Sequence, residues 1–389
     1  MAFTLADILC FLKTYDERMY PVWPVINTER IIAAFRHDWD NPELCALVFA
    51  VCAGTGAQLQ FNSYAQEWSA VRTPRGNDSM ALEDRFAVEA ERYRSKYDYR
   101  ESTTTEAILV PLFLHFYYGA KGKKQTTSFL LREAVTLCQL TGLDKEETYR
   151  GLNPEDESCR RRTFWLLYVT ERGHAMQQGT RICLAKTISL PSDDSQNKPH
   201  VLQAFNTLVH LFASVDGVLV DHETGTKGQC QRYSIEMLSQ LQHKLRHHDQ
   251  WPVEWTEAQR GDIAMTQQWL RILVWQLSLR NISMSSKPAD DSMSFTYPAR
   301  VSKDALCSIS TVHVDALVAH GPGMARQTLH ELCCYLVKLN NNCEDLDWLR
   351  KRLTDFNVLF QRVRELPAIS ELPYDESDLA STSPLPSDP

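Results

Sequence analysis

The sequence predicts an all-α fold, a large multi-helix domain of packed antiparallel helices. Three observations support this fold class. Apolar residues recur at the 3.6-residue spacing of helices over most of the chain. No segment shows a sustained alternation of apolar and polar residues, and no Asn-Gly hairpin is present. Glycine is scarce, with 15 among 389 residues, which disfavours a loop-rich or all-β fold.

The N-terminal helices are indicated by apolar spacing and by capping residues. The first helical stripe consists of Leu5, Ile8, Leu9 and Leu12. Segment 20–26 contains two prolines and is expected to be extended, because a residue before proline is pushed out of the α region. Asn27 is placed to cap a helix that ends near Phe35. Pro42 begins a long apolar helix that ends near Leu59.

Glycines and prolines mark the next elements. Gly54 and Gly56, near the end of the apolar helix, indicate either close helix packing or a weakened turn. Segment 71–77 is expected to be a loop. A mixed-charge helix is expected over 83–99. An apolar helix over 104–118, broken or kinked at its proline, is followed by a basic turn at 119–124.

Residues 129–172 predict an αα-hairpin, around which the rest of the chain is organised. One helical face of its first half consists of Leu130, Ala134, Leu137, Cys138 and Thr141. Gly142 stands where a C′ glycine takes a positive φ without steric cost. The second half begins with Asn153 as N-cap and Pro154 at the first helical position, followed by acidic residues. Two strong helices joined by a short polar link form such a hairpin.

Three consecutive arginines in this second helix cannot form one patch. Arg160, Arg161 and Arg162 point about 100° apart around the helix, so at least one should face inward and pair with an acid. Glu157 is four residues before Arg161 and suits that role, and Glu171 is a second candidate. The aromatic residues nearby are predicted to lie in the core rather than in a ligand site; they are Phe164, Trp165 and Tyr168.

Further helices are expected after the hairpin. Their ranges are 201–220, 229–245, 256–284, 301–319, 325–339 and 346–364. We therefore assign residues 1–364 to one domain and residues 365–389 to an acidic disordered tail. The mixture of acidic and apolar residues in that tail also fits an activation segment, although a plain solvated tail is the favoured interpretation.

Composition limits the classes of function. A net charge of −8 argues against direct nucleic-acid binding, which depends on Lys and Arg. No signal peptide is visible, and the longest apolar run is too short to span a bilayer, so no membrane partner is expected. The eleven cysteines include no Cys-x-x-Cys pair and are expected to be reduced thiols, most of them on apolar helical faces.

The sequence shows no catalytic motif, and we expect no enzyme activity, cofactor, catalytic residue or metal site. Glycine-rich phosphate loops and a Gly-x-Ser-x-Gly elbow are absent from it. His330 and Glu331 begin a His-Glu-x-x-His pattern, but Cys334 occupies the second ligand position. A structural role is therefore favoured for these residues.

The hairpin resembles the middle homology region of fungal Zn2Cys6 transcription factors. The positions that carry the resemblance are Arg132, Glu133, Ala134, Gly142, Leu143, Glu157, Arg160, Arg161, Arg162, Phe164, Trp165, Leu167, Tyr168, Glu171 and Arg172. Two positions depart from the family pattern. Glu171 stands where Asp is usual, and Gly179-Thr180-Arg181 replaces a Gly-Arg-Pro loop. Segments 269–279 and 295–300 are similar to the later half of regulators of the amylolytic and maltose-activator type.

The resemblance implies a transcriptional regulator in the nucleus that controls a fungal metabolic or secondary-metabolite gene cluster. This sequence holds no cluster of six cysteines, so we expect a co-regulator that acts through a DNA-binding transcription factor or the transcription machinery, with a small-molecule effector. One alternative is a truncated Zn2Cys6 activator of carbohydrate-utilisation genes. Another is a helical small-molecule-binding protein or enzyme.

Overall fold

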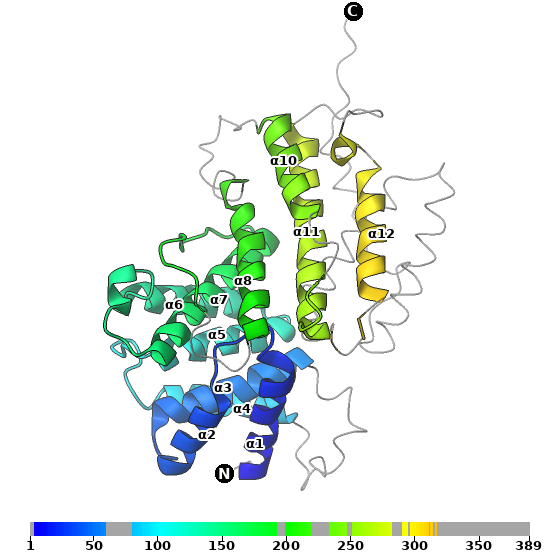
Figure 1. Cartoon of the computed structure of the whole chain (residues 1–389). Coiled ribbons are helices and arrows are strands. Elements are labelled where there is room, and N and C mark those ends of the chain that lie inside the picture. Colours follow the sequence, from blue (N-terminus) through cyan, green and yellow to red (C-terminus); the bar gives the residue numbers. More distant parts are fainter. Residues whose placement is uncertain are drawn as a thin grey trace, which may run out of the picture.

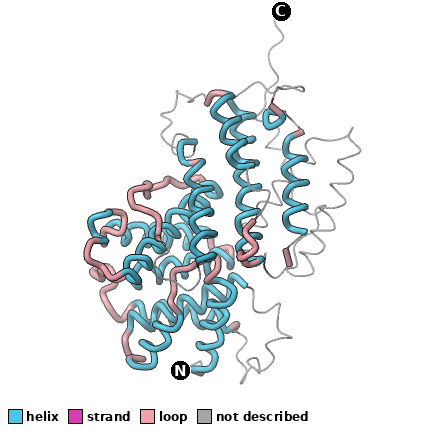
Figure 2. The backbone as a smooth tube through the Cα atoms, viewed as in Figure 1, coloured by secondary structure: helices cyan, strands magenta, loops and turns pink. Residues whose placement is uncertain are grey.

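The computed structural model describes residues 4–59, 80–192, 199–218, 233–246, 251–281, 290–294, 296–310, 312–313 and 316. These residues form helices and loops, and no β-strand occurs among them (Figures 1 and 2). The predicted all-α fold is therefore confirmed. The expected loop at 71–77, the helices at 325–339 and 346–364, the cysteine and histidine residues around 330 and the acidic tail lie outside the described residues.

Of the α-helices within the described residues, seven precede residue 180 and four follow it. The first group is α1 (Leu5–Thr14), α2 (Thr28–His37), α3 (Pro42–Leu59), α4 (Leu82–Arg94), α5 (Thr105–Ala120), α6 (Lys124–Leu140) and α7 (Pro154–Gln178). The second group is α8 (Pro199–Ser214), α10 (Ile235–Arg246), α11 (Glu257–Asn281) and α12 (Tyr297–Ser310). Short helical turns are η1 (Tyr15–Met19), η3 (Glu146–Tyr149) and η4 (Asp291–Met293).

Helix α3 is the most buried helix of the first group and packs against α1, α4 and α5. A Cβ atom built on Gly56 would lie 2.7 Å from Phe11 and 2.8 Å from Glu83. One built on Gly54 would lie 3.0 Å from the carbonyl oxygen of Phe113. Of the two interpretations of these glycines, close helix packing is therefore correct.

Two helical stretches are long and apolar enough to cross a membrane by length and composition alone, 42–59 and 199–218. In α3 this property has a simpler explanation, because 83% of its apolar window is buried inside the protein. A helix that is apolar all round is expected at the centre of a large helical core.

Three sequence-based predictions in the first half need correction. Segment 20–26 is not extended: Tyr20 is helical, with φ −55° and ψ −37°, and the amides of Val22 and Trp23 both donate to the carbonyl of Met19. Burial of the aromatic side chains here outweighs the preference of a pre-proline residue. Helix α4 ends at Arg94 rather than near Tyr99. Helix α5 continues through Pro111, so the predicted break is wrong, while the alternative of a kink at this residue stays a prediction.

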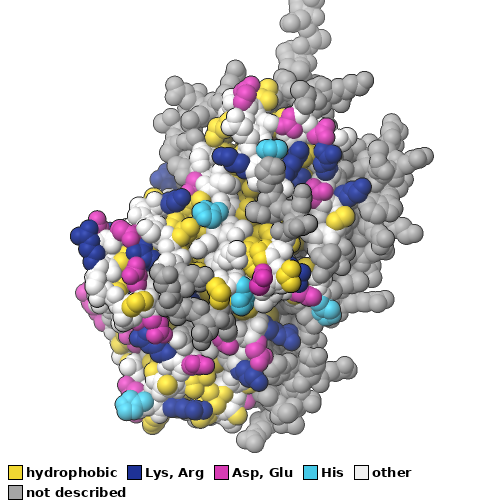
Figure 3. All heavy atoms as spheres, in the orientation of Figure 1, with side chains coloured by type: hydrophobic (Ala, Val, Ile, Leu, Met, Phe, Trp, Pro, Cys, Tyr) yellow, Lys and Arg dark blue, Asp and Glu magenta, His cyan; other side chains and the backbone are white. Residues whose placement is uncertain are grey.

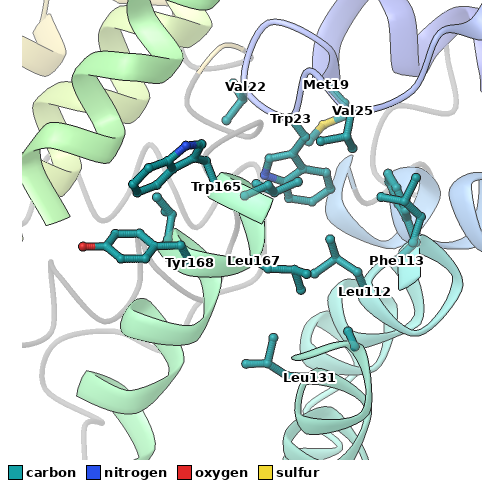
Figure 4. Close-up of a cluster of buried hydrophobic side chains, with 14 of the residues drawn as sticks. Met19, Val22, Trp23, Val25, Leu112, Phe113, Leu131, Trp165, Leu167 and Tyr168 are labelled. Atoms are coloured by element: carbon teal, nitrogen blue, oxygen red, sulfur yellow. The ribbon is translucent and has the colours of Figure 1, made fainter. Parts of the chain in front are cut away.

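The core lies where α5, α6 and α7 meet the turn that follows η1. Figure 4 shows Trp23 of this turn between Phe113 of α5 and Trp165 of α7. The ring of Trp23 also stacks on Phe116, with ring centroids 3.9 Å apart. Phe164, Trp165 and Tyr168 have fully buried side chains, which confirms their predicted place in the core.

Helix α8 connects this first group to the second. It contacts α7 on one side and both α10 and α11 on the other, and Figure 1 shows it between them. Beyond α11, a second apolar cluster joins α11 to α12; it consists of Met265, Ile272, Trp275, Tyr297, Val301, Ala305 and Val312. Helix α12 begins at Tyr297, four residues earlier than the sequence suggested.

Candidate functional site: the polar network of the central hairpin

The hairpin of α6 and α7 is closed by the predicted caps. Gly142 has φ +74°, its amide donates to Gln139, and the amide of Leu143 donates to Cys138, the paired bonds of a Schellman motif. At the start of α7 the Asn153 side chain accepts from the amide of Asp156 at 2.8 Å. The predictions for Gly142 and Asn153 are confirmed. Helix α7 ends at Gln178, and Gly179, which follows it, is left-handed with φ +64°.

Glu171 joins α7 to α6 and to the segment after α7. Its side chain is 1% exposed. Its carboxylate accepts from the amides of Cys183 and Leu184, at 2.8 and 2.9 Å, and from Arg132 Nη1 at 3.1 Å. Arg132 also donates to the carbonyl of Arg181. Burial raises the pKa of Glu171, and the two amides and the arginines oppose that shift. A carboxylate in this setting fixes three chain segments relative to one another.

Arg172 joins α7 to the turn after α8. Its guanidinium forms an ion pair with Asp216 and donates to the carbonyl of Leu184 at 3.0 Å. It also lies over the ring of Tyr168, 3.2 Å from the ring centroid, and the Tyr168 hydroxyl donates to the same aspartate. Burial, and then the hydrogen bond to Asp216, raises the pKa of Tyr168, so the phenol stays protonated as a donor.

Of the three consecutive arginines in α7, Arg161 is the one that pairs with acidic side chains. Its Nε donates to Glu157 at 2.9 Å, which confirms the predicted pairing of these two residues. Two further hydrogen bonds, at 3.0 and 2.6 Å, go to Glu146 in the link between the helices. Glu146 in turn accepts from the amide of Ser189 at 2.8 Å. The hydrogen bonds from Arg161 hold the pKa of Glu146 below its usual value.

The other two arginines of the run point elsewhere, as their helical spacing predicts. Arg162 is buried and donates to the hydroxyl of Tyr20 at 2.9 Å, which ties α7 to the turn after η1. Arg160 is half-exposed. Glu133 forms an ion pair with the buried Arg94 of α4, with N and O atoms 2.9 Å apart.

One predicted pairing is wrong. Glu171 does not pair with the arginine run, because ten residues along a helix place it on the face toward α6 and residues 183–184. Sequence reasoning also missed four partners of the network, namely Tyr20, Arg94, Glu146 and Asp216. Of these four, only Glu146 could have been suggested by the sequence, because it is an acid in the polar link and lies fifteen residues from Arg161.

The charged side chains of this network are engaged with one another or with the backbone. Among the described residues, no group of three or more His, Cys, Asp or Glu side chains is arranged to hold a metal ion. Buried thiols such as Cys52 and Cys138 have raised pKa values because of desolvation, so they remain protonated. The network can therefore fix helix positions, and its geometry suits a conformational scaffold.

Comparison with known protein families shows which family this chain belongs to. Residues 12–313 match the fungal specific transcription factor domain. The chain belongs to this family. The match begins within α1, ends just beyond α12 and includes the whole polar network. The protein is thus a transcriptional regulator.

This chain is also similar to three curated fungal proteins. Probable sucrose utilization protein SUC1 of Candida albicans is 24% identical over 98% of this chain and 74% of its own length. Maltose fermentation regulatory protein MAL63 of Saccharomyces cerevisiae is 23% identical, over 92% of this chain and 72% of its own. Maltose fermentation regulatory protein MAL13 of the same yeast is 22% identical, over 84% and 66%.

Proposed function

We propose that this chain is the regulatory domain of a nuclear regulator that controls genes for sugar utilisation. The observation that carries the proposal is the similarity, over almost the whole chain, to proteins named for sucrose utilisation and maltose fermentation. Those names favour carbohydrate-utilisation genes over a secondary-metabolite gene cluster, which the sequence alone left open.

The structure suggests how such a domain would work. We propose that the motif residues of the central hairpin act structurally, because Glu171 and Arg172 of α7 hold α6, residues 183–184 and the turn after α8 in one arrangement. Helix α8 then carries that arrangement to α10 and α11. A DNA-binding factor or the transcription machinery is the expected partner, and a small-molecule effector would act by favouring one arrangement of these helices.

A tethering experiment tests this function. The chain is fused to a heterologous DNA-binding domain, and reporter transcription is measured in fungal cells grown on sucrose, maltose or glucose. We expect the output of the fusion to differ between sugars, while the DNA-binding domain alone gives the same output on all three. A fluorescent fusion of the same chain should accumulate in the nucleus.

Transcript profiling of a strain that lacks the gene provides the second measurement. Sugar transporters and glycosidases should be the transcripts that change. The proposal fails if reporter output is the same on every sugar and the deletion leaves these transcripts unchanged. Turnover of a small molecule by the purified chain, together with those two results, would favour the enzyme alternative.

A further inference from the structure

Helix α6 of the central hairpin has an uncharged outer surface. The helix packs against α5 and α7, and Figure 1 shows it on the opposite side of the molecule from α12. Figure 3 shows acidic and basic side chains interspersed over most of the visible face of the protein. The exposed positions of α6 between residues 125 and 140 differ from this pattern, because none of them carries a charge. They are Gln125, Thr126, Phe129, Thr136, Gln139 and Leu140.

Three of these residues follow one line along the helix and form what we name the α6 stripe. Phe129 is 67% exposed and Leu140 is 73% exposed. Eleven residues separate them, so they lie about 20° apart around the helix and about 16 Å apart along it. The third residue, Thr136, lies between them. Its hydroxyl donates to the carbonyl of Arg132 at 2.8 Å, so Thr136 can be covered without losing a hydrogen bond.

The two charged residues beside the α6 stripe are paired within the chain. Arg132 forms an ion pair with Glu171, with N and O atoms 3.1 Å apart, and Glu133 forms one with Arg94 at 2.9 Å. The Glu133 side chain is only 15% exposed. A protein that covers the α6 stripe therefore leaves no charge without a partner, which is the main cost of burying ionised groups.

A second copy of this chain is the partner that best fits such a surface. Each copy carries a net charge of −8, so two copies repel one another overall. They can meet closely only through surfaces that place no like charges opposite one another. The α6 stripe meets this condition when it packs against itself, whereas a partner recognised by its charge would find no complement there. A two-fold axis beside α6 would join the same stripe of both copies in one isologous contact.

We infer that two copies of this chain associate through their α6 stripes. Helix α6 has 17 residues, which makes it about 25 Å long and about 10 Å wide with its side chains. One face of it covers much less than the roughly 800 Å² per partner of a standard interface. The dimer is therefore weak and forms at micromolar rather than nanomolar concentrations of the chain. The inference does not rest on the proposed function.

Sedimentation velocity of the purified full chain, from about 1 to about 200 µM, tests this association. We expect monomers at the lowest concentration and dimers at the highest. The double variant Phe129→Ser, Leu140→Ser should raise the dissociation constant of the dimer at least about tenfold, because apolar area is lost from the contact. Thr136→Glu should raise it similarly, because it brings two carboxylates together.

Val253→Ser is the matched control. Val253 is 92% exposed and lies between α10 and α11, so this variant should form dimers like the parent chain. All the substituted residues are exposed, and circular dichroism should show the parent fold in every variant. The inference is overturned if the parent chain stays monomeric at the highest concentration. It is also overturned if both α6 variants form dimers as readily as the parent, or if Val253→Ser weakens the dimer as much as they do. Because sedimentation measures no transcription, each of these results leaves the proposed function standing.

Discussion

At the residue scale, Glu171 and Arg172 both bind the backbone of Leu184. Its N–H donates to Glu171 and its C=O accepts from Arg172. Two adjacent residues of one helix thus bind both backbone polar groups of the same residue, which belong to two successive peptide bonds. A helix places consecutive side chains about 100° apart, so the acid also reaches α6 while the arginine reaches Asp216. In this chain the two neighbouring residues therefore make contacts in two directions.

Replacing Glu171 by Gln should destabilise the protein strongly. The variant keeps the shape of the side chain, but one of its two acceptor oxygens becomes an NH₂ group that faces backbone amides or Arg132. We expect a loss of about 2–3 kcal/mol in the free energy of unfolding, measured by urea denaturation. Glu157→Gln is the matched control, since it removes a 38%-exposed acid of the same helix and should cost at most about 1 kcal/mol. Equal losses in the two variants would contradict the role given to Glu171.

The buried ring of His115 should make the free energy of unfolding depend on pH. Burial lowers its pKa from 6.5 to about 4, and its Nδ1 donates to the carbonyl of Thr127 at 2.9 Å. Between these two pKa values the unfolded chain binds a proton that the folded chain does not, so stability falls as pH decreases from 6.5 to about 4. The pKa of His174, whose ring centroid is 5.5 Å away, is lowered as well and acts in the same direction.

The His115 contribution can be measured by denaturation at a series of pH values. The fall in the pKa of His115 from 6.5 to about 4 corresponds to about 3 kcal/mol of unfolding free energy across this window. In His115→Asn the amide nitrogen can take the place of Nδ1 as donor, and the group no longer titrates. The variant should therefore lose less stability than the parent between pH 6.5 and 4; identical pH profiles would refute the assignment.

At the element scale, helix packing depends on where glycine occurs. Gly56 of α3 has no room for a Cβ atom between Phe11 of α1 and Glu83 of α4. Gly56→Ala should cost about 1–3 kcal/mol through overpacking. Gly173 of α7 has nothing within 4 Å of the same position, so Gly173→Ala should gain up to about 1 kcal/mol from helix propensity. The melting temperature should fall in Gly56→Ala and rise in Gly173→Ala. An unchanged melting temperature in Gly56→Ala would contradict the close packing described at that glycine.

The caps and the helix contacts also show what the sequence could and could not predict. Asn153 and Gly142 were assigned correctly because a cap depends on residues within one turn of the helix. Asp216 could not be assigned to Arg172, because 44 residues separate them and only the packing of α8 brings them together. The same reason explains the wrong prediction at Tyr20. The rule for a residue before proline predicts an extended backbone there, but Tyr20 is helical and its hydroxyl accepts from Arg162, 142 residues away. Local interactions fix elements, whereas long-range packing fixes the site.

At the scale of the whole molecule, α8 is the connection between the hairpin and the second group of helices. It contacts α7 on one side and α10 and α11 on the other (Figure 1). The turn that ends it carries Asp216, the partner of Arg172 and Tyr168. If this ion pair holds the two groups of helices together, weakening it should affect the second group more than the first.

Asp216→Asn tests this connection. The Asp216 side chain is 25% exposed, so an asparagine amide fits in its place and remains in contact with water. The substitution removes the ion pair with the buried Arg172. In hydrogen exchange, we expect faster exchange of the amides in α8, α10 and α11, because local opening of these helices becomes less costly. The amides of α3 and α5, packed in the first group, should exchange as in the parent chain. Uniformly faster exchange would mean that the pair supports global stability instead, and unchanged exchange in α8 would mean that it does not connect the two groups.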